Sequence, residues 1–193
     1  MWISRDRVNQ AARALQSGFW ILLLLGSGCT KILVKEPFGE FVKTSELDEK
    51  PVYYDAEGKR FRISPTDNPL EFKVEDLTDG QESFQRMRIS SQDPGDVILG
   101  WFWEEQHEAW ILVRLLSGGG ESLCIMQPDL DTLRAEATQG DFTLVEVEKS
   151  KSGSSYLIDG KIDPEYWTHN DAWAINQVRC FFKETTSLEE KRP

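Results

Sequence analysis

The chain has few side chains suited to nucleophilic catalysis: three cysteines and two histidines in 193 residues. The best arrangement combines Cys124 as the thiol, His169 as its base and Asp171 as the acid that orients the base. Cys124 lies within an apolar stretch, where a thiol is usually inert. The sequence contains no Gly-x-Ser-x-Gly turn and no glycine loop that ends in the Lys of a phosphate site. It therefore identifies no catalytic residue and argues against an enzyme without excluding one.

The best candidates for metal ligands are carboxylates near a histidine. Glu104, His107 and Glu108 form a loose group in a polar bend, where acidic side chains are simply solvated. Asp129 and Asp131 stand at the start of a predicted helix, and the helix dipole explains acids at that place. No Cys-x-x-Cys or His-Glu-x-x-His spacing occurs. We therefore expect neither a metal nor another cofactor.

Tryptophans are the most suggestive residues for ligand binding. Five of the seven follow residue 28, and Trp101, Trp103 and Trp110 fall on two neighbouring predicted strands. Rings side by side on a sheet face can bind a sugar or a lipid. Tryptophans in strands also commonly belong to the core, and the sequence leaves both interpretations open.

The first residues have the organisation of a signal peptide. Residues 1–17 are polar and basic, and Phe19–Leu25 is an apolar run of seven residues. A membrane-spanning helix needs about 20 apolar residues, so this run matches the core of a signal peptide better. The small residues Gly26–Gly28 follow, and then Cys29.

The sequence Leu25-Gly26-Ser27-Gly28-Cys29 resembles the lipobox of bacterial lipoproteins. The resemblance implies that the Cys29 thiol carries diacylglycerol and that the mature chain begins there. It also implies export and a lipid anchor, with the periplasmic face of an outer membrane favoured because Thr30 is not acidic. Gly26 departs from the pattern, which prefers a large aliphatic residue. An ordinary cleaved signal and an uncleaved apolar helix are the alternatives.

Lipidation of Cys29 leaves Cys124 and Cys180. In an oxidising compartment these two can form a disulfide, or they can remain as separate buried thiols. A bond would close a loop of roughly 57 residues and contribute about 4 kcal/mol by chain entropy. Their spacing alone does not decide between the two states.

Charge divides the chain into two parts. The first 28 residues carry three arginines and one aspartate, a net charge of +2, whereas the whole chain carries −11. The remaining residues therefore carry −13, which argues against nucleic acid as a partner because phosphates need clustered Lys and Arg. The acidity is best explained by solubility, with a cation-rich partner as the alternative.

Alternating apolar residues predict strands along most of the chain. They lie at 52–54, 60–63, 70–74, 84–89, 97–103, 110–116, 123–126, 142–147 and 156–158. A helix is predicted over Leu130–Thr138, with Gly140 as its stop. A second helix is predicted from Asp163 and Pro164, while the later stretch Val178–Phe182 fits either a helix or a final strand.

These patterns predict a signal peptide (1–28), a lipidated Cys29 with a tether (29–50), one β-rich domain (51–186) and a charged tail (187–193). The predicted fold class is α+β, a mainly antiparallel sheet of about eight strands with one or two helices. The alternative is a β-barrel with an attached helix.

Three functions are compatible with the sequence. The first is an envelope lipoprotein that binds or scaffolds a partner without catalysis. The second is a carrier of a small hydrophobic ligand or a sugar, with a pocket lined by tryptophans. The third is an envelope hydrolase.

Overall fold

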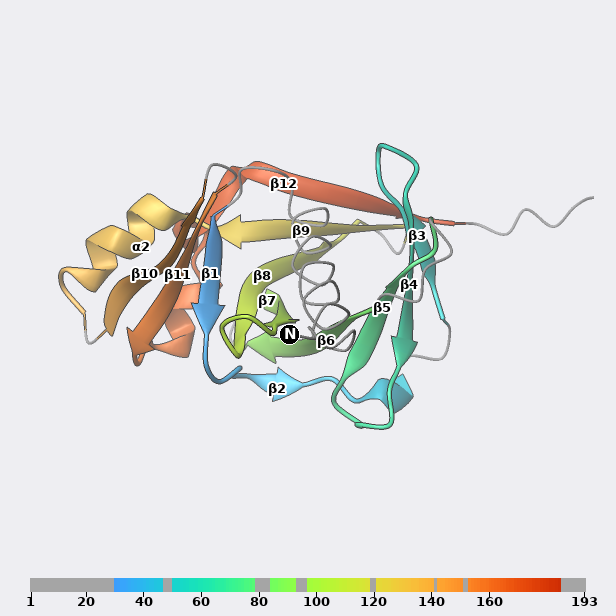
Figure 1. Cartoon of the computed structure of the whole chain (residues 1–193), viewed down its shortest axis with the longest axis horizontal. Helices are drawn as coiled ribbons and strands as arrows, with labels where there is room; N and C mark the ends of the chain where they lie inside the picture. The colour runs from blue at the N-terminus through green and yellow to red at the C-terminus, as the bar shows by residue number, and fades with distance from the viewer. Residues whose placement is uncertain are drawn as a thin grey trace, which may run out of the picture.

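The computed structural model describes residues 30–46, 50–78, 84–92, 97–118, 121–140, 142–150 and 153–184. The predicted signal peptide, Cys29 and the charged tail lie outside the described residues. Within them the chain is mostly strand, with one α-helix (Figure 1).

Eight strands close into an antiparallel barrel. They are β3 (Val52–Tyr54), β4 (Arg60–Pro65), β5 (Phe72–Asp76), β6 (Phe84–Gln92), β7 (Val97–Glu104), β8 (Ala109–Ser117), β9 (Ser122–Pro128) and β12 (Trp173–Lys183). The order around the barrel is β8-β7-β6-β5-β4-β3-β12-β9, and β9 pairs with β8 to close it. The mainly antiparallel sheet is confirmed, and its closure matches the predicted alternative, a barrel with an attached helix, more closely than the main prediction of an α+β fold.

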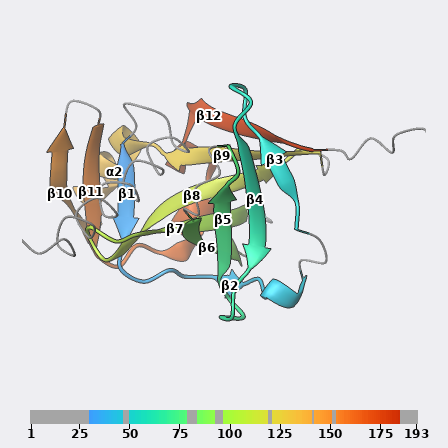
Figure 2. The same cartoon turned by 45° about the vertical axis from the view of Figure 1, so that its right-hand side comes forward.

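The barrel sheet continues outward through three more strands, β1 (Lys31–Val34), β11 (Gly153–Gly160) and β10 (Phe142–Ser150), which lie side by side in Figures 1 and 2. One edge of β8 pairs with β1 through Trp110 and Ile111, and with β9 from Arg114 onward. A two-residue strand, β2 (Glu40–Phe41), pairs with the end of β6.

The segment predicted as a tether contributes to this sheet. β1 lies between β8 and β11, and its residues Ile32 and Leu33 are only 1% and 0% exposed. Four residues are too few to show a period, so the sequence did not reveal this strand. Residues before 51 therefore belong to the same sheet as the rest of the fold.

The predicted first helix is present as α2 (Leu130–Ala137), and the Asp129 side chain accepts a hydrogen bond from the Thr132 N–H at its start. The predicted second helix is wrong beyond its first turns. Asp163 caps only a 3₁₀ helix, η2 (Pro164–Thr168), and a second short turn, η3 (Asn170–Ala172), follows. Strand pairing of β12 with β9 and β3 then overrides helix formation.

The turn between β3 and β4 follows the sequence closely. The Asp55 carboxylate accepts hydrogen bonds from the N–H groups of Glu57 and Lys59. Gly58 has φ +80°, a conformation that glycine adopts without strain. Asp55 and Gly58 therefore supply the side-chain acceptor and the backbone freedom that this hairpin turn needs.

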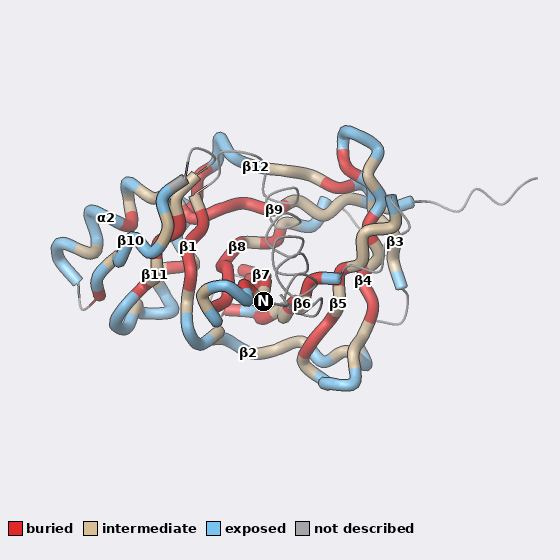
Figure 3. Tube along the Cα trace, in the orientation of Figure 1, coloured by how far each residue is buried: buried red, intermediate tan, exposed pale blue. Residues whose placement is uncertain are grey.

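Two apolar clusters lie on opposite faces of β7, β8 and β1, where buried residues concentrate (Figure 3). The interior cluster fills the barrel with side chains that include Phe61, Phe72, Met87, Phe102 and Phe181. The outer cluster lies between the outer face of these strands and α2, η2 and β10, and it includes Trp101, Trp110, Leu133, Trp167 and Trp173.

Candidate functional site

Two arginines and two tryptophans meet on the outer face of the barrel, over β6, β7 and β8. The Arg86 guanidinium carbon lies 5.1 Å from the Trp103 ring centre and 5.6 Å from that of Trp110. The Arg88 guanidinium carbon lies 4.6 Å from the Trp110 ring centre. We call these four residues, with Glu71 beneath the arginines, the Arg–Trp surface.

Strand register positions this group. Trp103 and Trp110 are directly paired across β7 and β8, and their ring centres are 5.1 Å apart. Arg88 faces Trp101 across β6 and β7, which places Arg86 beside Trp103. Side chains two residues apart on a strand share a face, so the two arginines lie over neighbouring rings.

Glu71 binds both arginines. Its Oε1 accepts from Arg86 Nη2 at 3.0 Å and from Arg88 Nη2 at 2.6 Å, and its Oε2 accepts from Arg86 Nε at 3.1 Å. Burial alone would raise the pKa of the Glu71 carboxyl, but the hydrogen bonds and charges of Arg86 and Arg88 lower this pKa below its usual value. The carboxylate is therefore ionised, and the group carries a net positive charge on an acidic protein.

The outer rim of the Arg–Trp surface is accessible. The Arg86 side chain is 40% exposed and that of Arg88 is 25% exposed. Phe84, two residues before Arg86 on β6, is 61% exposed. Arg, Trp and Phe are enriched at the centres of protein interfaces, so the composition of this surface suits partner binding.

The three tryptophans singled out in the sequence have different environments. Trp101 is fully buried in the outer cluster, where its Nε1 donates to Ser90 Oγ at 2.9 Å and its ring meets the edge of Phe38. Trp110 is 4% exposed, and Trp103 is partly exposed. Trp103 and Trp110 lie together, but Trp101 belongs to the core and contributes no open binding face.

The barrel interior leaves little room for a ligand. A cavity of about 30 Å³ lies among its side chains. The wall is entirely apolar, with Phe61, Met87, Phe102, Leu115 and Phe181 among its residues. Pockets for small molecules typically hold about 300–1,000 Å³, and this volume is close to that of a single water.

A second hollow of about 460 Å³ lies between α2 and the η2–η3 turns. Its lining residues are Thr132, Glu136, Asp163, Glu165, Tyr166, His169, Asp171 and Ala172. Burial, and then the negative charges of Glu136, Asp129 and Asp171, raise the pKa of Tyr166 to about 12, so its phenol stays protonated. The hollow therefore brings His169 together with carboxylates, and we call it the acidic cleft.

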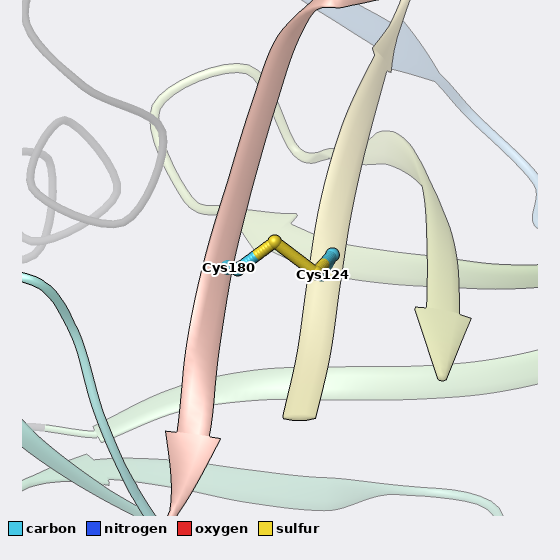
Figure 4. The surroundings of a disulfide bond; sticks show 2 residues. All are labelled: Cys124 and Cys180. Carbon is cyan, nitrogen blue, oxygen red and sulfur yellow. A yellow bond between two sulfur atoms is a disulfide. The ribbon is translucent and has the colours of Figure 1, made fainter. Parts of the chain in front are cut away.

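Cys124 and Cys180 form a disulfide between β9 and β12 (Figure 4). The two residues are paired in register, with their Cα atoms 4.0 Å apart. A sulfur in this bond cannot serve as a nucleophile, so the arrangement of Cys124 with His169 is not formed. The bond instead links the two strands next to the closure of the barrel at β8.

The carboxylates near His107 are not assembled into a metal site. Glu104 is 2% exposed and binds Lys31, with Oε2 and Nζ 3.2 Å apart. Among the described residues, no group of three or more His, Cys, Asp or Glu side chains gathers at distances suited to a metal ion. In the same part of the chain, no helix has the length and apolar character needed to cross a membrane.

Sequence reasoning did not identify Glu71 or the role of the arginines. Arg86 and Arg88 alternate along a predicted strand, but their neighbours depend on the register of β6 with β7 and β5. An Arg-x-Arg pair on a strand beside a strand rich in Trp is the signal that could have identified them. No family model, curated protein or solved structure matches this chain.

Proposed function

We propose that this chain is a bacterial envelope lipoprotein that binds or scaffolds a partner and does not act by catalysis. The observation that carries the proposal is the lipobox-like sequence ending at Cys29, two residues before a strand of the folded core. Lys31 is anchored by its ion pair with Glu104, and Ile32 and Leu33 are buried. An acyl group on Cys29 would therefore hold the barrel directly at the membrane.

The filled interior supports binding at the surface over carriage of a ligand. The cavity of about 30 Å³ inside the barrel is too small for a sugar or a lipid. The Arg–Trp surface supplies an accessible alternative, with Phe84 and Arg86 exposed beside Trp103. A partner that offers carboxylates or apolar side chains would complement it.

The intact mass of the protein, purified from membranes of a bacterium that processes lipoproteins, tests the anchor. We expect a chain that begins at Cys29 and carries the added mass of its acyl groups. The Cys29→Ser variant should lose this mass, whereas the matched Ser27→Ala variant should retain it. An unmodified chain that still begins with Met1 would overturn the proposal.

The binding role needs its own test. A photo-reactive amino acid at position 84 should crosslink to a discrete partner in intact cells, because Phe84 lies at the rim of the Arg–Trp surface. The same group at the exposed position 67, in the turn between β4 and β5, should not give that product. Loss of the product in Arg86→Ala would assign the contact to this surface, and identical products at both positions would contradict it.

A hydrolase is the second candidate, and the acidic cleft is the observation that favours it. His169 lines this cleft with Glu136, Asp163, Glu165 and Asp171, which are residue types that perform general acid–base chemistry. The test is hydrolysis of peptidoglycan and ester substrates by the wild-type protein and by His169→Ala. Activity that falls at least tenfold in the variant would support this function, and equal rates would remove it.

A further inference from the structure

Exposed apolar side chains concentrate on one side of the barrel. Four of the eight large hydrophobic residues exposed in the described part of the chain lie on β12 or its neighbour β3. Ile175 is 72% exposed, Phe182 45%, Tyr54 41% and Val178 40%. We call these four residues the β12 apolar face.

Three of the four residues share one outward face. Ile175 is exposed on the stretch before Val178, where the register of β12 with β9 shifts. Phe181 belongs to the barrel interior, so residues on the opposite face of the strand point outward. These residues are Val178, Cys180 and Phe182. Tyr54 and Phe182 are paired in register, and their ring centres are 5.8 Å apart. The disulfide at Cys180 lies between Val178 and this aromatic pair. A contiguous apolar surface of this kind usually marks an interaction site.

The β12 apolar face lies beside the start of β1. β1 and β9 occupy the same edge of β8 one after the other, and β12 is the next strand beyond β9. The first residue of β1 is therefore about one or two strand spacings, roughly 5–10 Å, from β12. Figures 1 and 2 agree, because β12 and the beginning of β1 lie on the upper side of the molecule in both.

The connection to the lipid site is too short to separate the barrel from the membrane. Cys29 precedes Lys31 by two residues, and two extended residues span at most about 7 Å. β1 itself is fixed by its buried side chains and by the ion pair of Lys31 with Glu104. Acyl chains on Cys29 would thus hold the side of the barrel around the start of β1 close to the lipid headgroups.

A lysine lies two strands from the start of β1, on the side away from β12. Lys31 is paired in register with Ser155 of β11, and the exposed Lys149 of β10 is paired with the adjacent Ser154. A lysine at this position offers a positive charge to anionic headgroups, although the domain as a whole is acidic.

We propose that the β12 apolar face rests on the bilayer that holds the Cys29 acyl chains, so that the lipid fixes the orientation of the barrel. The inference rests on the proposed lipidation. Ile175 and Val178 enter the interface between headgroups and acyl chains. The Arg–Trp surface is then left for the partner.

Tryptophan quenching by brominated lipids tests this orientation. The lipidated full-length protein is reconstituted in vesicles of phosphatidylethanolamine and phosphatidylglycerol, with and without bromine on the acyl chains. Ile175→Trp adds a fluorophore on the proposed contact, and Asp67→Trp adds one at the turn between β4 and β5, on the lower side in Figures 1 and 2. Both positions are exposed, so both variants should fold.

We expect the emission added by Ile175→Trp to be quenched at least about twofold more than that added by Asp67→Trp, since interfacial residues reach the upper acyl region. Equal quenching of the two variants would refute the proposed orientation. The orientation would also be refuted if Ile175→Trp were not quenched and the protein crosslinked to a second copy through β12. The intact mass is measured on the same samples. Missing acyl groups would refute the proposed function, whereas acyl groups without quenching would refute only this inference.

Discussion

The barrel interior and the outer cluster are built by different means on two faces of the same strands. Among the described residues, the interior cluster holds mainly aliphatic side chains and phenylalanines and no tryptophan. The outer cluster holds Trp101, Trp110, Trp167 and Trp173, and two of these rings make hydrogen bonds: Trp101 Nε1 with Ser90 Oγ and Trp173 Nε1 with the Trp167 carbonyl. The apolar interior cluster depends on side-chain volume, whereas the tryptophans of the outer cluster also require particular hydrogen-bond partners.

The interior face of the strands is therefore used for packing, whereas the outer face also offers an accessible surface. Non-directional contacts fill a closed barrel, and the small remaining cavity leaves no room for a ligand. On the outer face, the layer of tryptophans reaches solvent at Trp103, within the partly exposed Arg–Trp surface. Four substitutions test the comparison, and we take them from the largest expected effect to the smallest.

Trp101→Ala should have the largest effect, because it removes one of the two largest fully buried side chains and leaves Ser90 Oγ without the indole donor. We expect the free energy of unfolding to fall by about 3–5 kcal/mol. Trp103→Ala, on the neighbouring partly exposed ring, should cost about 1–2 kcal/mol. Urea unfolding of both variants measures the difference, and equal costs would mean that Trp101 is not a core residue.

Replacing both cysteines of the disulfide by serine should destabilise the protein by about 2–4 kcal/mol, since Cys124 and Cys180 join strands at the barrel closure. The measurement is thermal unfolding of the double variant under conditions that keep the parent oxidised. Reduction of the parent with dithiothreitol should produce the same loss. A double variant as stable as the oxidised parent would show that strand pairing alone holds β9 to β12.

Gly100→Ala should cost about 1–3 kcal/mol, because an added Cβ would lie 2.9 Å from Val113 Cγ2 and 3.0 Å from Leu115 Cδ2 in the interior. Val74→Ile is the matched control, because Val74 lines the small cavity and has room for one more methylene. We expect the control to change stability by less than about 1 kcal/mol. Equal losses in urea unfolding would show that the interior has no local spare volume.

The smallest effect should come from Glu71. Its folded-state pKa lies below the ordinary value of 4.5, so its ion pairs stabilise the fold fully above that pH. This contribution is lost as the pH falls through the lower folded-state pKa. Urea unfolding between pH 6 and pH 3 should therefore depend less on pH in Glu71→Gln than in the wild type. The exposed Glu105→Gln should retain the wild-type dependence.

The sequence predicted most elements where a period was long enough to recognise. Alternation placed Leu99, Trp101 and Trp103 on one face of β7, and all three belong to the outer cluster or pack against it. Asp129 correctly marked the start of α2. These predictions succeeded because side-chain period and capping chemistry are local properties of the chain.

Closure of the barrel could not be predicted in the same way. It depends on pairing of β12 with β3, which places Phe182 opposite Tyr54 from more than 100 residues away. Trp173–Lys183 has no clear period, because register shifts interrupt its pairing with β9. The Arg–Trp surface was missed for a related reason, since Glu71 meets Arg86 and Arg88 only through strand register.

The position of β1 has a consequence for how the protein folds. This first strand pairs with β8 and with β11, and β11 begins more than 110 residues later in the chain. β3 likewise pairs with β12, so the barrel cannot close until the last strand is available. Contacts of such long sequence separation form slowly. While the chain is synthesised from its N-terminus, β3 to β9 can pair one after another, but β1 must wait for β8 and β11, and the free edge of β3 stays unpaired until almost the whole domain has been made.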